Sequence, residues 1–258
     1  MTGISRAISI EAVPGLPLVE PGDDLTVLIS DALGRSGQQL RNGDILVITQ
    51  KIVSKAEGRY VFLDQVIPSA RAVEIAAATE KDPRHVELIL NESTEIVRQA
   101  PRVLIVAHRL GCVMANAGID ESNIAQEPGR PRVLLLPEDP DASASAFKEK
   151  LEARHGASIG IVITDSFGRP WRNGVTGVAL GAAGVASLVD MKGRPDLFGR
   201  ALRVTEIAVA DQIAAAATLV MGEADEAVPV VLMRGFVSTA AERAASSLVR
   251  SRAQDLFR

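Results

Sequence analysis

The residues best suited to chemistry follow an apolar run near the middle of the chain. Residues 161–163 are β-branched and predict a buried strand, and Asp165 and Ser166 come soon after them. A strand that ends on a carboxylate and a hydroxyl presents hard oxygen ligands where open sheets commonly bind their ligands. Arg169 and Arg172 follow, and their guanidinium groups suit phosphate or carboxylate. The alternative for this segment is an Asp turn with two solvated arginines.

Further groups of the same kind stand at predicted loops and strand ends. Asp120 and Asn123 lie in a polar, glycine-punctuated segment, Glu223 follows a predicted helix, and Lys55 follows a predicted strand. Separated carboxylates accompanied by basic and amide groups suit Mg²⁺ or Mn²⁺ holding a polyphosphate. The alternatives are a helix N-cap for Asp120 and protection of a strand edge for Lys55.

Several other chemistries are excluded by motif. No glycine is followed by lysine and no two glycines are two residues apart, which removes the Walker A loop and the dinucleotide fingerprint. A nucleophile elbow is missing, and no histidine is near Ser166 in sequence, so a serine hydrolase is not supported. Cys112 is the single cysteine, which excludes an intrachain disulfide and a thiolate metal site.

Composition describes an ordinary globular chain of 258 residues, with 47% hydrophobic and 23% charged residues. A net charge of −4, the absence of Lys/Arg clusters and only 3% aromatic residues argue against nucleic acid as a partner. No signal peptide is apparent and no charge-free apolar run reaches membrane-spanning length, so we expect a cytoplasmic protein without a membrane partner.

The patterns predict alternating strands and helices without a linker or repeat. Glycines at 174, 177, 181 and 184 favour close packing over phosphate binding. The strand that ends at 49 is expected to run into residues 50–58. Strands are predicted over 4–13, 44–49, 103–106, 133–137, 161–163 and 229–233. Helices are predicted over 25–34, 69–80, 83–98 with a break near 91–93, 139–154 and 204–221, and from 238 to near 255–257.

Taken together, the motifs closely resemble the coenzyme F420:L-glutamate ligase family, the GTP-dependent γ-glutamyl ligases of deazaflavin biosynthesis. The resemblance runs from about residue 8 to the C-terminus. The motifs that carry it are Gly15-Leu16-Pro17, Pro21-Gly22-Asp23-Asp24-Leu25, Asn42-Gly43-Asp44, Ser54-Lys55, Arg109-Leu110-Gly111, Ala117-Gly118-Ile119-Asp120, Thr164-Asp165-Ser166-Phe167-Gly168-Arg169-Pro170-Trp171-Arg172, Met221-Gly222-Glu223 and Asp255-Leu256-Phe257.

The resemblance implies a mixed α+β fold of two lobes, a single ligase domain over 1–258 without a nitroreductase-like domain, and an intertwined homodimer. It also implies GTP as co-substrate and two divalent cations, Mg²⁺ or Mn²⁺, with K⁺ as a further candidate. The implied metal ligands are Asp120, Asp165, Ser166 and Glu223. The implied nucleotide contacts are Leu16, Pro17, Leu18, Val19, Gln50, Lys55, Asn123, Met221 and Gly222, and the implied catalytic residues are Asp165, Arg169 and Arg172.

Two positions depart from the family pattern: Gln50 replaces a small hydroxyl residue, and Glu223 replaces a glutamine. The implied reaction joins L-glutamate to coenzyme F420-0 through an acyl phosphate, with release of GDP and phosphate. One rival is an amide ligase for a different phosphorylated carboxylate. The other is a nucleotide-binding regulatory or scaffold protein without catalysis.

Overall fold

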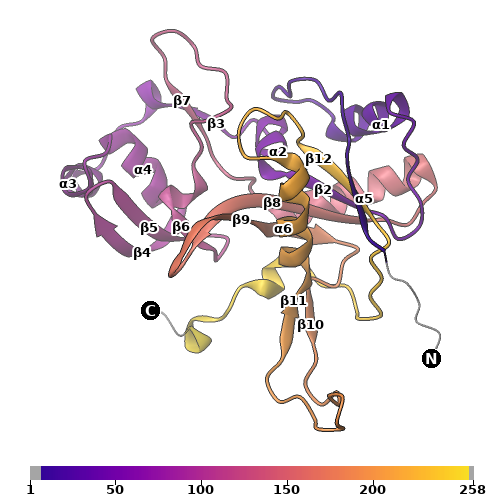
Figure 1. The fold of residues 1–258 in the computed structure, drawn as a ribbon. Helices are drawn as coiled ribbons and strands as arrows, with labels where there is room; N and C mark the ends of the chain where they lie inside the picture. The colour runs from indigo at the N-terminus through magenta and orange to yellow at the C-terminus, as the bar shows by residue number, and fades with distance from the viewer. Residues whose placement is uncertain (1–6, 256–258) are drawn as a thin grey trace.

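A five-stranded mixed sheet forms the centre of the structure, a computed structural model that describes residues 7–255 (Figure 1). The strand order is β1-β12-β2-β8-β9, and only the β2–β8 pair is parallel. The fold is therefore a mixed α+β arrangement, as predicted. The strands are β1 (Ser9–Ala12), β2 (Ile45–Thr49), β8 (Gly160–Arg169), β9 (Arg172–Ala183) and β12 (Val230–Arg234).

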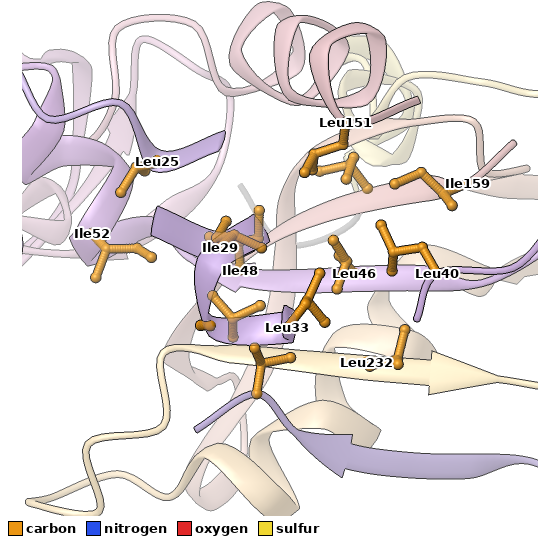
Figure 2. Packing of buried hydrophobic residues seen from close by; sticks show 14 of the residues in the cluster. Leu25, Ile29, Leu33, Leu40, Leu46, Ile48, Ile52, Leu151, Ile159 and Leu232 are labelled. Carbon is orange, nitrogen blue, oxygen red and sulfur yellow. The ribbon is translucent and has the colours of Figure 1, made fainter. Parts of the chain in front are cut away.

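Helices cover both faces of this sheet. Leu46 and Ile48 of β2 pack with α1 (Leu25–Arg35) and α5 (Pro140–His155), as Figure 2 shows for part of that cluster. Val47, which points to the opposite face, packs with α6 (Val209–Met221). Because alternate residues of β2 are buried on opposite faces, the strand reads as one continuous apolar run.

A second group of elements has its own apolar core and lies to one side of the sheet (Figure 1). It occupies the long crossover between the parallel strands β2 and β8, a connection that must span many residues. It consists of β3 (Tyr60–Phe62), α3 (Ala70–Thr79), α4 (Pro83–Asn91), β4 (Ser93–Ala100), β5 (Val103–His108), β6 (Val113–Ala115) and β7 (Arg132–Leu134). We call this group the crossover core.

A two-stranded ribbon, β10 (Leu188–Asp190) and β11 (Glu206–Ala208), extends away from both cores (Figure 1). The loop that joins its strands carries Leu197 and Phe198, which are 99% and 90% exposed. Within the described residues, no helix has the length and apolar character that a transmembrane span requires.

The segment after β2 differs from the prediction. Residues 50–56 do not extend the strand but form the helix α2 (Gln50–Ala56), which starts directly at the end of β2. The helix therefore places Lys51 and Lys55 one turn apart, on the same side. The extended prediction was wrong here because no turn residue separates the strand from the helix.

Two predicted helices were too long. The helix predicted over 83–98 ends at Asn91, because residues 93–100 pair with β5 as strand β4. The helix predicted from 204 begins at Val209, because residues 206–208 form β11. In both cases strand pairing outweighs the local helical pattern, although the break predicted near 91–93 matches the end of the first helix.

The two ends of the chain also differ from the prediction. The tail contains only short 3₁₀ turns, at Ala245–Leu248 and Arg252–Gln254, and its predicted end at 256–257 lies outside the described residues. The first strand covers 9–12 of the predicted 4–13, and residues 4–6 also lie outside the described part.

The glycines of β9 allow helices to approach the sheet closely, as predicted. A Cβ at Gly177 would lie 2.5 Å from the carbonyl oxygen of Ala214 in α6. A Cβ at Gly181 would lie 2.2 Å from the carbonyl oxygen of Pro140 in α5. Close helix packing is therefore confirmed at Gly177 and Gly181, whereas nothing lies within 4 Å of a Cβ at Gly174.

Candidate active site

The carboxylates of Asp120 and Asp165 come from different cores and lie near one another. Asp165 stands inside β8, one residue beyond the last parallel pair with β2, and not at the end of the strand as predicted. Asp120 is bridged to Leu134 at the edge of the crossover core. Burial raises the pKa of Asp165 to about 7, and the neighbouring charge of Asp120 contributes to the rise. Such mutual repulsion is relieved by a bound cation.

Gln50 holds the carboxylate of Asp120 in place. Its Nε2 donates a 2.9 Å hydrogen bond to Asp120 Oδ2, while its Oε1 accepts one of 2.9 Å from Ser54 Oγ. Gln50 is only 2% exposed and begins α2, so its position is set by the junction of strand and helix. In this structure Gln50 therefore contacts a predicted metal ligand, whereas the resemblance implied a nucleotide contact.

Two lysines of α2 face the same loop as Asp120. Lys51 Nζ lies 3.5 Å from Asp120 Oδ2 and also donates to the carbonyl of Ser122, at 3.2 Å. Lys55 Nζ donates to the carbonyl of Asn123, at 2.8 Å. Burial lowers the pKa of Lys55, and the positive charge of Lys51 lowers it further. Two lysine ammonium groups beside a pair of carboxylates suit a polyphosphate that a divalent metal ion links to the carboxylates.

Ser166 and Glu223 form a second pair of oxygen ligands. Ser166 Oγ donates a 2.8 Å hydrogen bond to Glu223 Oε1. Glu223 directly follows the turn at Gly222, which ends α6. Only glycine suits position 222, because its φ is 72° and an added Cβ would clash with the carboxylate of Glu226. Met221, the last residue of α6, is buried. The structure therefore places Met221 and Gly222 as supports for Glu223.

Asn123 connects these two halves of the site. Its Nδ2 donates a 2.9 Å hydrogen bond to the carbonyl of Ala224, which follows Glu223. The loop that carries Asp120 and the loop after α6 are thereby fastened together over α2. The alternative that Asp120 caps a helix is wrong, because residues 121–124 form turns and no helix follows.

The loop predicted to touch the nucleotide runs beside the end of α2. Gly22 N donates to the carbonyl of Ala56 at 2.9 Å, and the charge of Glu20 partly offsets the lowering of the Lys55 pKa. Within the predicted stretch, Leu18 is exposed and Val19 is buried, whereas Leu16 packs partly against the main core and Pro17 is exposed. The stretch therefore borders the lysines, and its nucleotide contact stays a prediction.

The two arginines are not brought to the carboxylates. Arg169 and Arg172 face each other at the tip of the β8–β9 hairpin and are exposed. At about 3.3 Å per residue, Arg169 lies roughly 13 Å along the strand from Asp165. Any role of these arginines requires a bound molecule that extends toward the hairpin tip.

Comparison with known proteins identifies the family. Residues 15–235 match the model of the family described as F420-0:gamma-glutamyl ligase, which is most of the chain. The chain belongs to this family. It is therefore a ligase.

Relatives named coenzyme F420:L-glutamate ligase match nearly the whole chain. A coenzyme F420:L-glutamate ligase of Methanothermobacter thermautotrophicus is 46% identical over 97% of this chain and 99% of its own length. Proteins of the same name from Methanopyrus kandleri and Archaeoglobus fulgidus are 46% and 42% identical, over 97% of this chain and 98% and 96% of their own lengths.

The oxygen donors of the candidate site fit a divalent cation whose coordination phosphate and water complete. Between residues 7 and 255, no three or more histidine, cysteine or acidic side chains converge on one point. Mg²⁺ is commonly held by one or two carboxylates and completed by phosphate oxygens and water. The pair Asp120 and Asp165 and the pair Ser166 and Glu223 fit that pattern, with hard oxygen donors only.

Lys51 and Lys55 were both predicted from the sequence as plausible phosphate contacts, but only Lys55 was given a role in the site. The spacing of four residues between them indicates a shared face only if the segment is helical. The sequence reasoning missed Asp211, which was assigned only to a helix and which the structure places beside Cys112.

Proposed function

We propose that this ligase joins L-glutamate to coenzyme F420-0 at the expense of GTP, and that it extends the γ-glutamyl tail. The observation that carries the proposal is the position of the carboxylates of Asp120 and Asp165 opposite Lys51 and Lys55. A carboxylate pair holds a divalent cation and a lysine pair holds phosphate oxygens, so together they suit the polyphosphate of a nucleotide.

The cation site would be shared by the two ligand pairs. Asp120 and Asp165 would hold one Mg²⁺ or Mn²⁺, and Ser166 and Glu223 would hold the other, with K⁺ as a further candidate nearby. The cations would supply charge neutralisation on the β- and γ-phosphoryl oxygens. Because the family resemblance implies a glutamine at this position, Glu223 would give the site one more negative charge.

The residues of the chain would act by positioning and charge stabilisation. Lys55 and Lys51 would bind the phosphate oxygens, and the loop 16–19 and Asn123 would hold the rest of GTP. Arg169 and Arg172 would meet the acceptor. The acceptor carboxylate oxygen would bond to the γ-phosphorus while the bond to the GDP oxygen breaks, which gives an acyl phosphate.

The second step would form the amide. The amine of L-glutamate, after loss of one proton, would attack the acyl carbon and expel inorganic phosphate, and the amine's remaining surplus proton would pass to solvent. No covalent attachment to the protein is needed, in keeping with a partly buried Cys112 whose thiol pKa is raised to about 11 by desolvation and by nearby carboxylates.

The protein is also proposed to act as an intertwined homodimer of two-lobed subunits. The feature that supports this is the β10–β11 ribbon, which extends from the body and exposes Leu197 and Phe198 at its end. Large exposed apolar side chains at the end of a projection are typical of contacts between subunits. The variant Phe198→Asp should shift the molecular mass measured by light scattering toward that of the monomer.

The experiment that tests the function is a reaction of the pure protein with F420-0, L-glutamate, GTP and Mn²⁺, followed by mass spectrometry. We expect products that are heavier by one or more glutamyl units, equal amounts of GDP and phosphate, and no product with Asp165→Ala. Glutamate incorporation by Asp165→Ala, or incorporation without a nucleotide, would rule out the proposed mechanism. A screen of other phosphorylated carboxylates tests the alternative acceptor.

A further inference from the structure

A cavity of about 720 Å³ lies beside the candidate active site, between the loop 110–113, strands β8 and β9, the start of α6 and the C-terminal segment. Its apolar lining comes from Leu110, Phe167, Leu180 and Val249. Val249 packs so closely on the loop that a Cβ at Gly111 would lie 2.6 Å from it. The C-terminal segment is therefore one wall of the cavity, and its volume is in the range of sites for small organic molecules.

The cavity adjoins the carboxylates of the active site. Phe167, which lines the cavity, is two residues after Asp165 on β8, and residues two apart on a strand point to the same side. Cys112 also lines the cavity, and the carboxylates of Asp165 and Asp211 both lie near enough to add to the burial that raises its pKa. A molecule in the cavity can therefore extend one end to Asp165.

Asp211 provides a hydrogen-bond acceptor in this apolar lining. Its Oδ1 accepts a 3.0 Å hydrogen bond from the backbone N–H of Ala179, which fixes the orientation of the carboxylate. Its Oδ2 accepts no hydrogen bond from any residue between 7 and 255, and the side chain lines the cavity. An acceptor held in this way is suited to an N–H group on the edge of a ligand.

Charge favours an uncharged ligand in the cavity. Acidic residues at its rim are used by the backbone: Oδ1 of Asp141 accepts from the N–H groups of Ala182 and Ala245. With Asp139, Asp211 and Asp255 also in the lining and Arg250 as the only cation among the lining residues, a phosphate would be repelled. A flat ring without charge would instead bury apolar surface against Phe167 and Leu180.

Resting on the function proposed above, we propose that this cavity holds the flat heteroaromatic ring of the acceptor. In this arrangement Oδ2 of Asp211 accepts a hydrogen bond from an N–H group on the ring edge. The chain of the acceptor then leads out of the cavity, and its carboxylate reaches the phosphate site at Asp165. Asp211 is thus a residue that determines which acceptor is bound.

The test measures binding of the ring alone. The probe is a 5-deazaflavin that carries only a ribityl chain, without phosphate or carboxylate, and its fluorescence is followed without GTP or metal. Asp211→Asn keeps an oxygen for the Ala179 N–H but presents an amide donor to the cavity, and Val178→Phe fills part of the cavity. We expect each to weaken binding about tenfold or more.

Matched controls carry the same chemical changes elsewhere. Glu149→Gln removes a negative charge from the exposed face of α5, and Val175→Phe enlarges an exposed residue of β9 outside the cavity lining. Both should bind the probe as the unmodified protein does. Thermal unfolding of each variant verifies its fold, and Val178→Phe decides the question if Asp211→Asn fails to fold.

The outcomes separate this proposal from the proposed function. If the unmodified protein adds glutamate to F420-0 but does not bind the ring, or if both cavity variants bind it normally, the cavity is not the ring site and the function still holds. If the ring binds and both variants lose it while no glutamate is incorporated, the ring site holds and the function fails. If neither binding nor ligation occurs, both proposals are overturned.

Discussion

The side-chain amide of Gln50 donates a 2.9 Å hydrogen bond to the carboxylate of Asp120, although seventy residues separate them in the chain. Gln50 belongs to the junction of β2 and α2, whereas Asp120 belongs to the crossover core. Together with the ion pair between Lys51 and Asp120, this contact sets the position of a candidate-site carboxylate relative to the central sheet.

Replacing Gln50 with leucine should weaken cation binding. Without the amide donor the Asp120 carboxylate is free to rotate, and loss of a group that orients a metal ligand typically costs 10- to 100-fold in affinity, so we expect an effect of about that size. Calorimetric titration with Mn²⁺ in the presence of GTP measures it. Gln212→Leu, on the exposed face of α6, is the matched control and should bind Mn²⁺ normally. Equal affinities of the two variants would contradict the role of Gln50.

Replacing Lys51 with methionine should weaken GTP binding more than cation binding. The change removes a positive charge beside Asp120 and Lys55 but keeps a side chain of similar length. One lost contact between a lysine and a phosphate should lower GTP affinity by about tenfold. The measurement is GTP titration at saturating Mn²⁺, with Lys150→Met on the exposed side of α5 as the control. The prediction is wrong if Lys51→Met and the control bind GTP equally.

Gly181→Ala should destabilise the protein, because the new Cβ would lie 2.2 Å from the carbonyl oxygen of Pro140. Relief of that clash requires α5 to shift away from β9, and overpacking of this kind costs about 1–3 kcal/mol. Gly168→Ala on β8 is the control, since nothing lies within 4 Å of its added Cβ. Urea unfolding should show a lower midpoint for Gly181→Ala only. A comparable loss in Gly168→Ala would show that the close approach is not the cause.

Glu92 should make the stability of the protein depend on pH in the acid range. Burial alone would raise the pKa of Glu92, but His108, Arg109 and Arg59 outweigh it and lower the pKa from 4.5 to about 2. Because the folded-state pKa is the lower one, the stabilisation is present above pH 4.5 and is lost as the pH falls toward 2. Its size is roughly 3 kcal/mol.

Urea unfolding between pH 2 and 7 measures this contribution. Glu92→Gln should lower the free energy of unfolding at pH 7 by about 2–3 kcal/mol and flatten its fall below pH 4.5. The control is Glu80→Gln, which breaks the ion pair between Glu80 and Arg102. Both side chains are largely exposed, so the variant should lose at most about 1 kcal/mol of stability. An unchanged acid profile in Glu92→Gln would assign the dependence to other groups.

Most residues of the candidate site could be selected from the sequence because they are polar residues that follow apolar runs or glycines. Asp165 and Ser166 follow an apolar run, Asp120 and Asn123 follow Gly118, and Glu223 follows Gly222. Their convergence could not be derived from local patterns, since it depends on contacts between the crossover core and the sheet. Strand β4 was missed for a different reason: residues 93–100 carry a local helical pattern, yet they pair with the adjacent strand β5.

The local structure of residues 50–58 decides how far apart Lys51 and Lys55 lie. If residues 50–58 were an extended strand, Lys51 and Lys55 would point to the same face of the strand, about 13 Å apart. As a helix, the same residues place both lysines over the loop of Asp120 and bury Gln50 beneath it. The cavity beside the site was likewise not predictable from the sequence, because Cys112 and Asp211 become neighbours only in the folded chain.

Asp120 and Asp165 are carried by two separately packed bodies, and Asn123 fastens the first of them to the turn after α6. Any ion that binds both carboxylates must therefore favour the arrangement in which these bodies are docked. By thermodynamic reciprocity, an ion that binds both carboxylates would tighten the docking by the same factor by which docking raises its affinity. A substitution that loosens the junction between the two bodies would then weaken cation binding, even at a position that never touches the cation.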